Sequence, residues 1–165
     1  AMKYQIVASD IRQAHLPHNL FVSGVFLFNL LMTPAVIVLN IGMIGLLIPL
    51  LCSAALAAYI YLRSRRSESG NGFVNAHWRL SWSRARWLLL GYGVSALLIL
   101  IAWLVSLTAR DTNMGHILWT ALTRIALVPT LILVMITVVL EASAIGQASN
   151  GEVPDSLVAK FPPPA

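Results

Sequence analysis

Residues 20–62 form a nearly continuous apolar run, and this run constrains the fold more than any other feature of the sequence. About 20 residues of α-helix cross the hydrocarbon layer of a bilayer, because a helix rises about 1.5 Å per residue. The run is long enough for two such crossings. Turn-forming residues gather at 40–45, so we predict one transmembrane helix over 19–39 and a second over 44–62.

Two more apolar runs follow, and they predict transmembrane helices over 87–108 and 116–140, separated by a short polar turn. The composition agrees, since 58% of the 165 residues are hydrophobic and only 10% are charged. Soluble domains average about 25% charged residues, so lipid must cover part of this surface. We therefore predict an all-α, polytopic membrane protein whose four-transmembrane-helix bundle occupies residues 19–141.

The segment 63–86 carries six of the eleven lysines and arginines, which is typical of a cytoplasmic loop. Within it, aromatic residues four positions apart share one helical face, with arginines among them. This pattern predicts a short amphipathic helix over 73–86 that lies on anionic lipid headgroups. The residues expected at that membrane interface are Trp78, Trp82, Arg79, Arg84 and Arg86.

The two ends of the chain are expected to lie outside the bilayer. Residues 1–18 repeat apolar positions at three- and four-residue steps, which favours a second interfacial helix before Pro17. Residues 142–165 are polar and end in prolines, so we expect a flexible tail. With the basic loop in the cytoplasm, an even number of crossings places both termini there too. A bacterial inner membrane fits the compact loops.

Small residues four positions apart allow helix backbones to approach closely in lipid, where the hydrophobic effect between helices is lost. Each of the last three predicted transmembrane helices contains such pairs. They are Ala54 and Ala58, Gly91 and Ser95, Ala102 and Ser106, and Ala126 and Thr130. We expect these pairs to lie at helix contacts.

Arg124 is the one charged residue inside a predicted transmembrane helix. A charge within the bilayer is costly and frequently functional, although arginine can also extend its head toward the lipid headgroups. The polar residues expected at a comparable depth, or beside Arg124, would form a ligand-binding patch with it. They are Asn29, Thr33, Thr120 and Thr123. The alternative is that the hydroxyl groups bond to their own helices.

Three histidines, His15, His18 and His77, are expected on the cytoplasmic side. Three imidazoles can bind zinc or copper, so these residues form a candidate metal site. Pro17 argues against it, because proline disturbs a helix that would align His15 with His18. Histidine at a membrane surface is also ordinary, and no cofactor is predicted.

Several classes of protein are disfavoured by what the sequence lacks. The predicted transmembrane helices contain no acidic residue for proton exchange and no mid-membrane histidine pair for a b-type haem. The single cysteine, Cys52, excludes a dithiol enzyme, and there is no glycine-rich phosphate loop. The net charge of +5 is concentrated in one loop, which argues against nucleic-acid binding.

The residues favour a non-catalytic accessory, anchor or ligand-binding subunit that packs in the bilayer against another membrane protein or a second copy of itself. Two alternatives stay open. One is a homo-oligomeric transporter or channel that selects an anionic or amphipathic molecule through Arg124. The other is an enzyme that modifies lipids or quinones through histidines at the cytoplasmic face.

Overall fold

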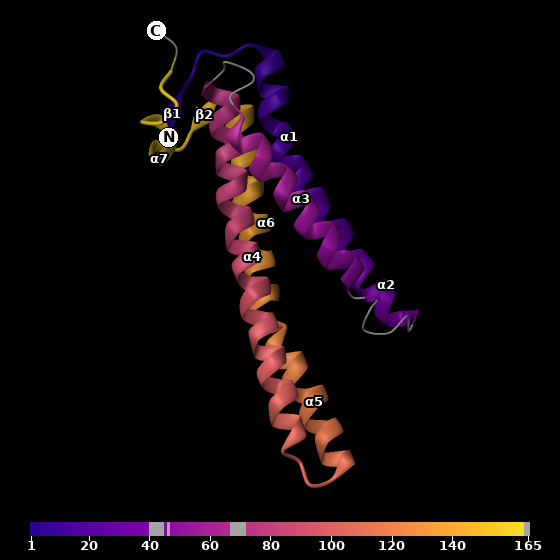
Figure 1. Ribbon diagram of the computed structural model, residues 1–165. Helices are drawn as coiled ribbons and strands as arrows, with labels where there is room; N and C mark the ends of the chain where they lie inside the picture. Colours follow the sequence, from indigo (N-terminus) through magenta and orange to yellow (C-terminus); the bar gives the residue numbers. More distant parts are fainter. Residues whose placement is uncertain (40–44, 46, 67–71, 164–165) are drawn as a thin grey trace. The chain divides into compact units, whose positions relative to one another are not determined.

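The computed structural model describes residues 1–39, 45, 47–66 and 72–163, and it confirms the all-α class. The predicted turn at 40–45 lies almost wholly outside the described residues. The helices and strands are shown in Figure 1. They are β1 (Met2–Lys3), α1 (Ala8–Gly24), the π-helix η1 (Val25–Met32), α2 (Thr33–Val38), α3 (Leu47–Arg65), α4 (Gly72–Leu107), α5 (Thr112–Ala126), α6 (Val128–Ser149), β2 (Glu152–Val153) and α7 (Asp155–Val158).

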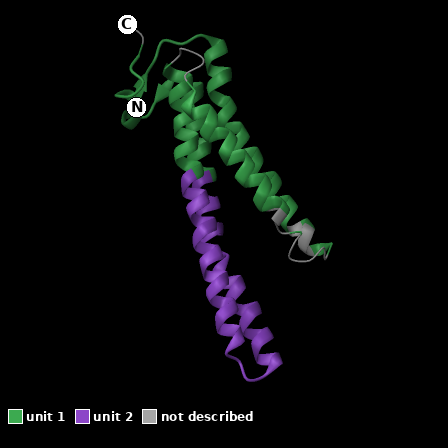
Figure 2. Cartoon of the chain, in the orientation of Figure 1, with its two compact units in different colours: residues 1–85, 138–165 green, residues 86–137 purple. Residues whose placement is uncertain are grey.

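The chain divides into two compact units (Figure 2). Unit 1 contains residues 1–85 and 138–165, and unit 2 contains residues 86–137. Helices α4 and α6 each contribute residues to both units. The largest buried side chains of unit 1 include Phe73 of α4 and Ile60 of α3.

The first helical stretch is continuous from Ala8 to Val38, so the predicted surface helix before Pro17 and the predicted transmembrane helix over 19–39 belong to one helical run. Pro17 lies inside α1 and is buried, and its carbonyl oxygen accepts a hydrogen bond from Ser81 Oγ at 3.2 Å. This contact links α1 to α4. The run widens to a π-helix just before Pro34, which has no amide hydrogen to donate.

Residues 72–107 form one uninterrupted helix, α4, where the sequence suggested a surface helix over 73–86 followed by a separate crossing. No proline falls within these 36 residues, so nothing in the backbone forces a break. The first turns are packed inside unit 1, and Trp78 is only 3% exposed. The segment therefore serves as a core element of unit 1.

The predicted helix over 116–140 is divided into α5 and α6 at Leu127, two residues before Pro129. Proline is tolerated in the first turn of a helix and disfavoured in its interior, which explains a new start at Val128. Helix α6 then continues to Ser149, nine residues beyond the predicted end at 140.

The C-terminal segment is ordered by pairing with the N-terminal one. Strand β2 is antiparallel to β1, with Met2 opposite Val153 and Lys3 opposite Glu152. The Tyr4 hydroxyl donates a hydrogen bond to the carbonyl oxygen of Phe161, and burial raises the pKa of this hydroxyl. The tail over 142–165 thus contains part of α6, a strand and the short helix α7.

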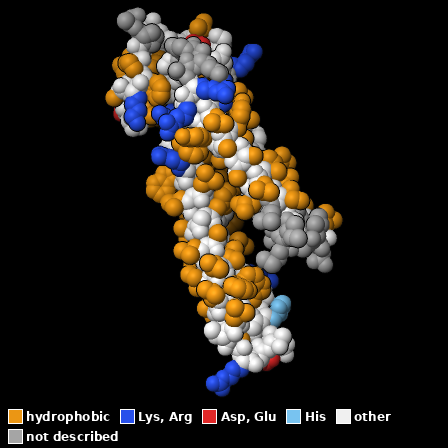
Figure 3. All heavy atoms as spheres, viewed as in Figure 1, with side chains coloured by type: hydrophobic (Ala, Val, Ile, Leu, Met, Phe, Trp, Pro, Cys, Tyr) orange, Lys and Arg blue, Asp and Glu red, His pale blue; other side chains and the backbone are white. Residues whose placement is uncertain are grey.

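In the part of the chain that the structure describes, two helical stretches are long and apolar enough to cross a membrane. They are Gly72–Leu107 and Thr112–Ser149. Only 22% of the most apolar window of each stretch is buried inside the chain. Large apolar side chains cover much of the visible surface (Figure 3).

Within unit 2, helices α4 and α6 meet at small and hydroxylated residues. Ser95 Oγ and Thr130 Oγ1 are 2.7 Å apart, and Thr130 Oγ1 also donates to the carbonyl oxygen of Gly91 at 3.2 Å. A Cβ atom at Gly91 would lie 2.6 Å from Leu133 Cδ1 and 3.3 Å from Leu133 Cβ. Gly91 therefore permits α4 and α6 to approach closely, as the small-residue pairs predict.

Substituting Gly91→Ile is expected to lower the free energy of unfolding by about 1–3 kcal/mol, because the new side chain separates α4 from α6. The matched control is Gly93→Ile, since a Cβ atom at Gly93 meets nothing within 4 Å. Thermal unfolding in mild detergent compares the two variants. Equal midpoints would show that Gly91 is not a contact point.

Candidate functional site

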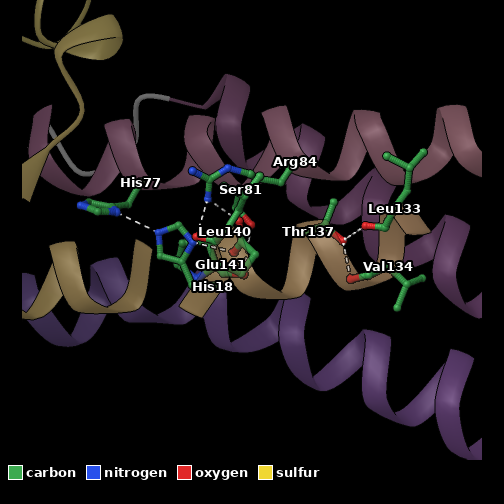
Figure 4. Close-up of polar contacts among 10 residues, drawn as sticks. His18, His77, Ser81, Arg84, Leu133, Val134, Thr137, Leu140 and Glu141 are labelled. Carbon is green, nitrogen blue, oxygen red and sulfur yellow. Dashed lines mark hydrogen bonds and ion pairs between the residues drawn. The ribbon is translucent and has the colours of Figure 1, made fainter. Parts of the chain in front are cut away.

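Four ionisable side chains from three helices of unit 1 form a buried cluster (Figure 4). We call His18 of α1, His77 and Arg84 of α4, and Glu141 of α6 the polar cluster. His18, His77 and Glu141 are each 0% exposed. Arg84 lies at the edge, with its side chain 15% exposed.

Hydrogen bonds connect the polar cluster in one continuous series. Glu141 Oε2 lies 2.7 Å from His18 Nδ1, and Glu141 Oε1 lies 3.3 Å from Arg84 Nη1. His18 Nε2 lies 2.8 Å from His77 Nδ1. His77 Nε2 lies 2.9 Å from the main-chain oxygen of Glu152 in β2. The series therefore joins α1, α4, α6 and β2.

Small residues on the three helices and contacts between aromatic rings position the side chains of the polar cluster. Ala14 of α1, Ala76 of α4 and Ala144 of α6 are fully buried, so the three helices carry little bulk beside the cluster. The His77 ring meets the Phe73 ring at 4.8 Å between centroids and the His18 ring edge-on at 5.0 Å. These contacts fix the orientation of the imidazole rings.

A buried carboxylate is costly unless it is paired and hydrogen-bonded. Both oxygens of Glu141 have partners, one in the guanidinium of Arg84 and one in the ring of His18. Arg84 also donates to the carbonyl oxygen of Leu140 at 2.9 Å. Removing one partner would leave its neighbour in the cluster with a hydrogen-bonding group unused.

The hydrogen bonds also define how many protons the series holds. Three bonds join the Glu141 carboxyl group, two imidazole rings and a carbonyl oxygen, and each bond contains one hydrogen. Two neutral imidazoles supply only two hydrogens, and the carbonyl supplies none. Completing all three bonds at once therefore takes one hydrogen more than two neutral rings supply.

Burial, followed by the neighbouring His18, lowers the pKa of His77 to about 3, so the His77 ring stays neutral within the series. All four ring nitrogens are engaged within the chain. This geometry suits a structural clamp between helices better than catalysis on an external substrate.

The three histidines of the candidate metal site do not share one centre. His18 and His77 are hydrogen-bonded to each other, whereas His15 Nε2 lies 2.8 Å from Ser149 Oγ on α6. Within the described ranges, no group of three or more His, Cys, Asp or Glu side chains is arranged to hold a metal ion. Helix α1 continues through Pro17. His15 is therefore kept from His18 and His77 by its own contact with Ser149, and not by a break in the helix.

The residues expected to form a ligand-binding patch belong to different units. Asn29 and Thr33 lie in unit 1, on η1 and at the start of α2. Thr120, Thr123 and Arg124 lie on α5 in unit 2.

Hydroxyl groups of this set bond to their own helices. Thr33 donates to Phe28 O at 3.0 Å, and Thr123 donates to Trp119 O at 2.7 Å. Both contacts match the ordinary behaviour of threonine in helices. The Arg124 side chain is exposed on α5.

The residues expected at the membrane interface have varied environments. Trp78 is buried against Tyr59, and the Trp82 ring contacts the Tyr61 ring at a tilt, with the centroids 4.7 Å apart. Arg84 belongs to the polar cluster. Arg79 is half-buried, and Arg86 is exposed.

Glu141 is the central residue that the sequence analysis does not single out, because it follows directly after the predicted helix over 116–140. The spacing of the residues around Glu141 nevertheless indicates that the helix continues past it. Thr137, Glu141, Ala144 and Ala148 follow one another at intervals of four, three and four residues, and all are at most 1% exposed. This is the spacing of one helical face, and it carries α6 beyond residue 141.

The polar cluster thus joins residues from three helices in an arrangement built from a histidine pair, a carboxylate and a guanidinium. Comparisons with protein-family models, with curated proteins and with solved structures gave no match.

Proposed function

We propose that the protein is a non-catalytic accessory subunit that crosses the cell membrane and packs its apolar helices against another membrane protein. The observation that carries the proposal is the exposed apolar surface of two helical stretches long enough to cross a bilayer. In water such a surface would be costly, at about 25 cal/mol per Å² of apolar area. Lipid or a partner protein removes that cost.

Arg124, the one arginine of α5, supports the proposal that the partner is a protein. Arg124 is exposed in this chain, on a helix with apolar neighbours such as the exposed Ile125. In a bilayer its guanidinium requires a carbonyl, carboxylate or phosphate group as a hydrogen-bond acceptor. A partner subunit can present such a group against α5. The closed hydrogen bonding of the polar cluster supports a structural role over an enzymatic one.

We further propose a topology of four crossings, in which residues 19–39 and 44–62 supply the first two. Both termini and the arginine-rich segment 63–86 would then face the cytoplasm, in accordance with the positive-inside rule. The pairing of β1 with β2 supports a common side for the two ends of the chain. A bacterial inner membrane is the proposed location.

Membrane insertion is tested with a charge on the exposed face of α4. Leu97 is 58% exposed, and Leu97→Asp is expected to disfavour insertion by about 2.5–3.5 kcal/mol at the centre of a helix. The measurement is resistance to alkaline carbonate extraction from membranes, with Leu97→Ala as the apolar control. Complete release of the unmodified protein by carbonate would contradict insertion.

The accessory role is tested by native mass spectrometry of the protein extracted from its own host in mild detergent. We expect a complex with a different polypeptide, and Arg124→Gln is expected to weaken that association. Arg110→Gln, in the turn before α5, removes the same charge outside the helix and serves as the control. A protein that occurs only alone or with copies of itself would contradict the proposal.

A further inference from the structure

The last described residues of the chain are tied to the first ones. We call residues 150–163 the C-terminal latch. Its strand β2 pairs with β1, and the Tyr4 amide donates a hydrogen bond to the carbonyl oxygen of Gly151 at 2.8 Å. The Tyr4 hydroxyl donates to the carbonyl oxygen of Phe161 in the same segment. Val153 is 0% exposed, so the C-terminal latch also contributes to the core of unit 1.

His77 joins the C-terminal latch to the polar cluster. Its Nε2 atom lies 2.9 Å from the main-chain oxygen of Glu152, and its Nδ1 atom faces His18 Nε2 at 2.8 Å (Figure 4). A carbonyl oxygen only accepts hydrogen bonds, so Nε2 must carry the hydrogen of the first contact. On a neutral ring Nδ1 is then an acceptor, and His18 Nε2 donates to it. Both contacts are therefore satisfied while His77 is neutral.

The surroundings of His77 disfavour a positive charge on its ring. The residue is 0% exposed, and burial penalises the charged form. Basic side chains act on it from two helices, namely His15 and His18 of α1 and Arg84 of its own helix α4. The carboxyl group of Glu141, on α6, contacts His18 and Arg84. Its contacts therefore compensate charge elsewhere in the polar cluster and not on His77.

The two strands add a main-chain oxygen and a neutral phenol to these surroundings. The oxygen of Glu152 accepts a hydrogen bond from the ring and so favours the charged form of His77 in part. Tyr4 packs on Phe73 at 6.1 Å between ring centroids, and Phe73 packs on His77. Burial raises the pKa of Tyr4, which keeps its hydroxyl neutral. Burial of His77 is the largest effect and His18 the second, and together they lower the pKa of His77 from 6.5 to about 3.

We propose that the C-terminal latch is released by acid, and that protonation of His77 is the trigger. Strand β2 occupies Nε2 of the buried ring, so an imidazolium there reaches water only when β2 moves away. A positive charge on His77 therefore favours the released state. This regulation acts within unit 1, and it does not depend on the proposed accessory role.

The direction of the pH dependence follows from linkage. In the released state His77 takes up a proton near its usual pKa of 6.5, whereas in the closed state its pKa is lowered to about 3. The closed state is therefore fully favoured above about pH 6.5 and loses stability as the pH falls toward 3. Within that window, each pH unit multiplies the ratio of released to closed protein by up to about tenfold.

The experiment measures hydrogen exchange of the Tyr4 amide by NMR, with the full chain in mild detergent, between pH 7.5 and pH 4.5. Exchange is expressed as a protection factor relative to an unfolded chain, so the pH dependence of the exchange chemistry cancels. We expect the protection of Tyr4 to fall about 50-fold or more. The Leu131 amide, which bonds to Leu127 in unit 2, should change less than about twofold. Constant protection of Tyr4, or a parallel fall at Leu131, would overturn the proposal.

His77→Gln is the test variant, because a glutamine amide can donate to Glu152 and accept from His18 but takes up no proton in this range. Its Tyr4 protection should stay constant between pH 7.5 and pH 4.5. The matched control is His116→Gln, which removes an exposed histidine from α5 in unit 2 and should retain the full acid response. An unchanged acid response in His77→Gln would also overturn the proposal.

A covalently closed latch keeps the test decisive if His77→Gln is open at every pH. Met2 lies opposite Val153 in the strand pair, so Met2→Cys with Val153→Cys, in a Cys52→Ser background, can form a disulfide across it. NMR titration of the His77 ring then follows proton uptake. The oxidised form should take up the proton at a lower pH than the reduced form, by about half a pH unit or more. Identical titration curves would show that His77 and the C-terminal latch are not linked.

Discussion

Glu141→Ala is expected to lower the free energy of unfolding by about 3–5 kcal/mol, which is the cost of breaking a buried ion pair by removing one partner. The substitution leaves His18 Nδ1 without its hydrogen-bond partner and deprives Arg84 of its carboxyl group. It also creates a small void beside fully buried Ala144. Equilibrium unfolding in mixed detergent micelles, followed by far-ultraviolet circular dichroism, measures the change.

Glu152→Ala is the matched control for this experiment. It removes another glutamate from unit 1, but His77 bonds to the main-chain oxygen of Glu152, which the substitution retains. The control should cost less than about 1 kcal/mol, as is usual for side chains outside a buried network. If Glu141→Ala cost no more than the control, the polar cluster would not be a clamp.

The largest total loss is expected for the double variant His18→Ala with Glu141→Ala, yet it should be smaller than the sum of the two single losses. His18 and Glu141 share one hydrogen bond, and each single substitution leaves the other residue buried with an unused group. Residues in one network typically show coupling energies of about 0.5–3 kcal/mol. A double-mutant cycle, with the same unfolding assay, yields this energy.

The control cycle combines His18→Ala with Thr130→Ala. Thr130 bonds to Ser95 and Gly91 in unit 2 and has no partner in the polar cluster. The losses of this pair should add within about 0.5 kcal/mol. Additive losses in the His18 and Glu141 cycle as well would contradict a shared network.

The helical class and the membrane-length apolar stretches could be predicted from the sequence, because both follow from the local composition and from the spacing of apolar residues along the chain. The apolar residues of 87–108 indicate a helix without any information about the rest of the fold. The ends of helices depend on single residues such as proline, and proline marks a helix boundary at one of two positions. Pro129 coincides with the start of a new helix, whereas Pro17 is held within α1 by its surroundings. A four-helix bundle was the finer prediction, and it stays a proposal.

The candidate site was only partly predictable, because its partners are distant in the chain. Histidines stand out by residue type, so His18 and His77 were selected, and the structure joins them. Glu141 lies 123 positions from His18, and no local pattern indicates that pairing. The tail was expected to be flexible because its residues are polar, but its order depends on β1 at the other end.

The long separation within the polar cluster has a consequence for how the protein is made. His18 leaves the ribosome 123 residues before Glu141, and at about 5–20 residues per second this delay lasts about 6–25 s. During that interval His18 lacks the carboxyl group with which it pairs in the folded chain. Strand β1 waits longer still for β2. A chain truncated before residue 141 would therefore lack the carboxyl group that pairs with His18 and Arg84.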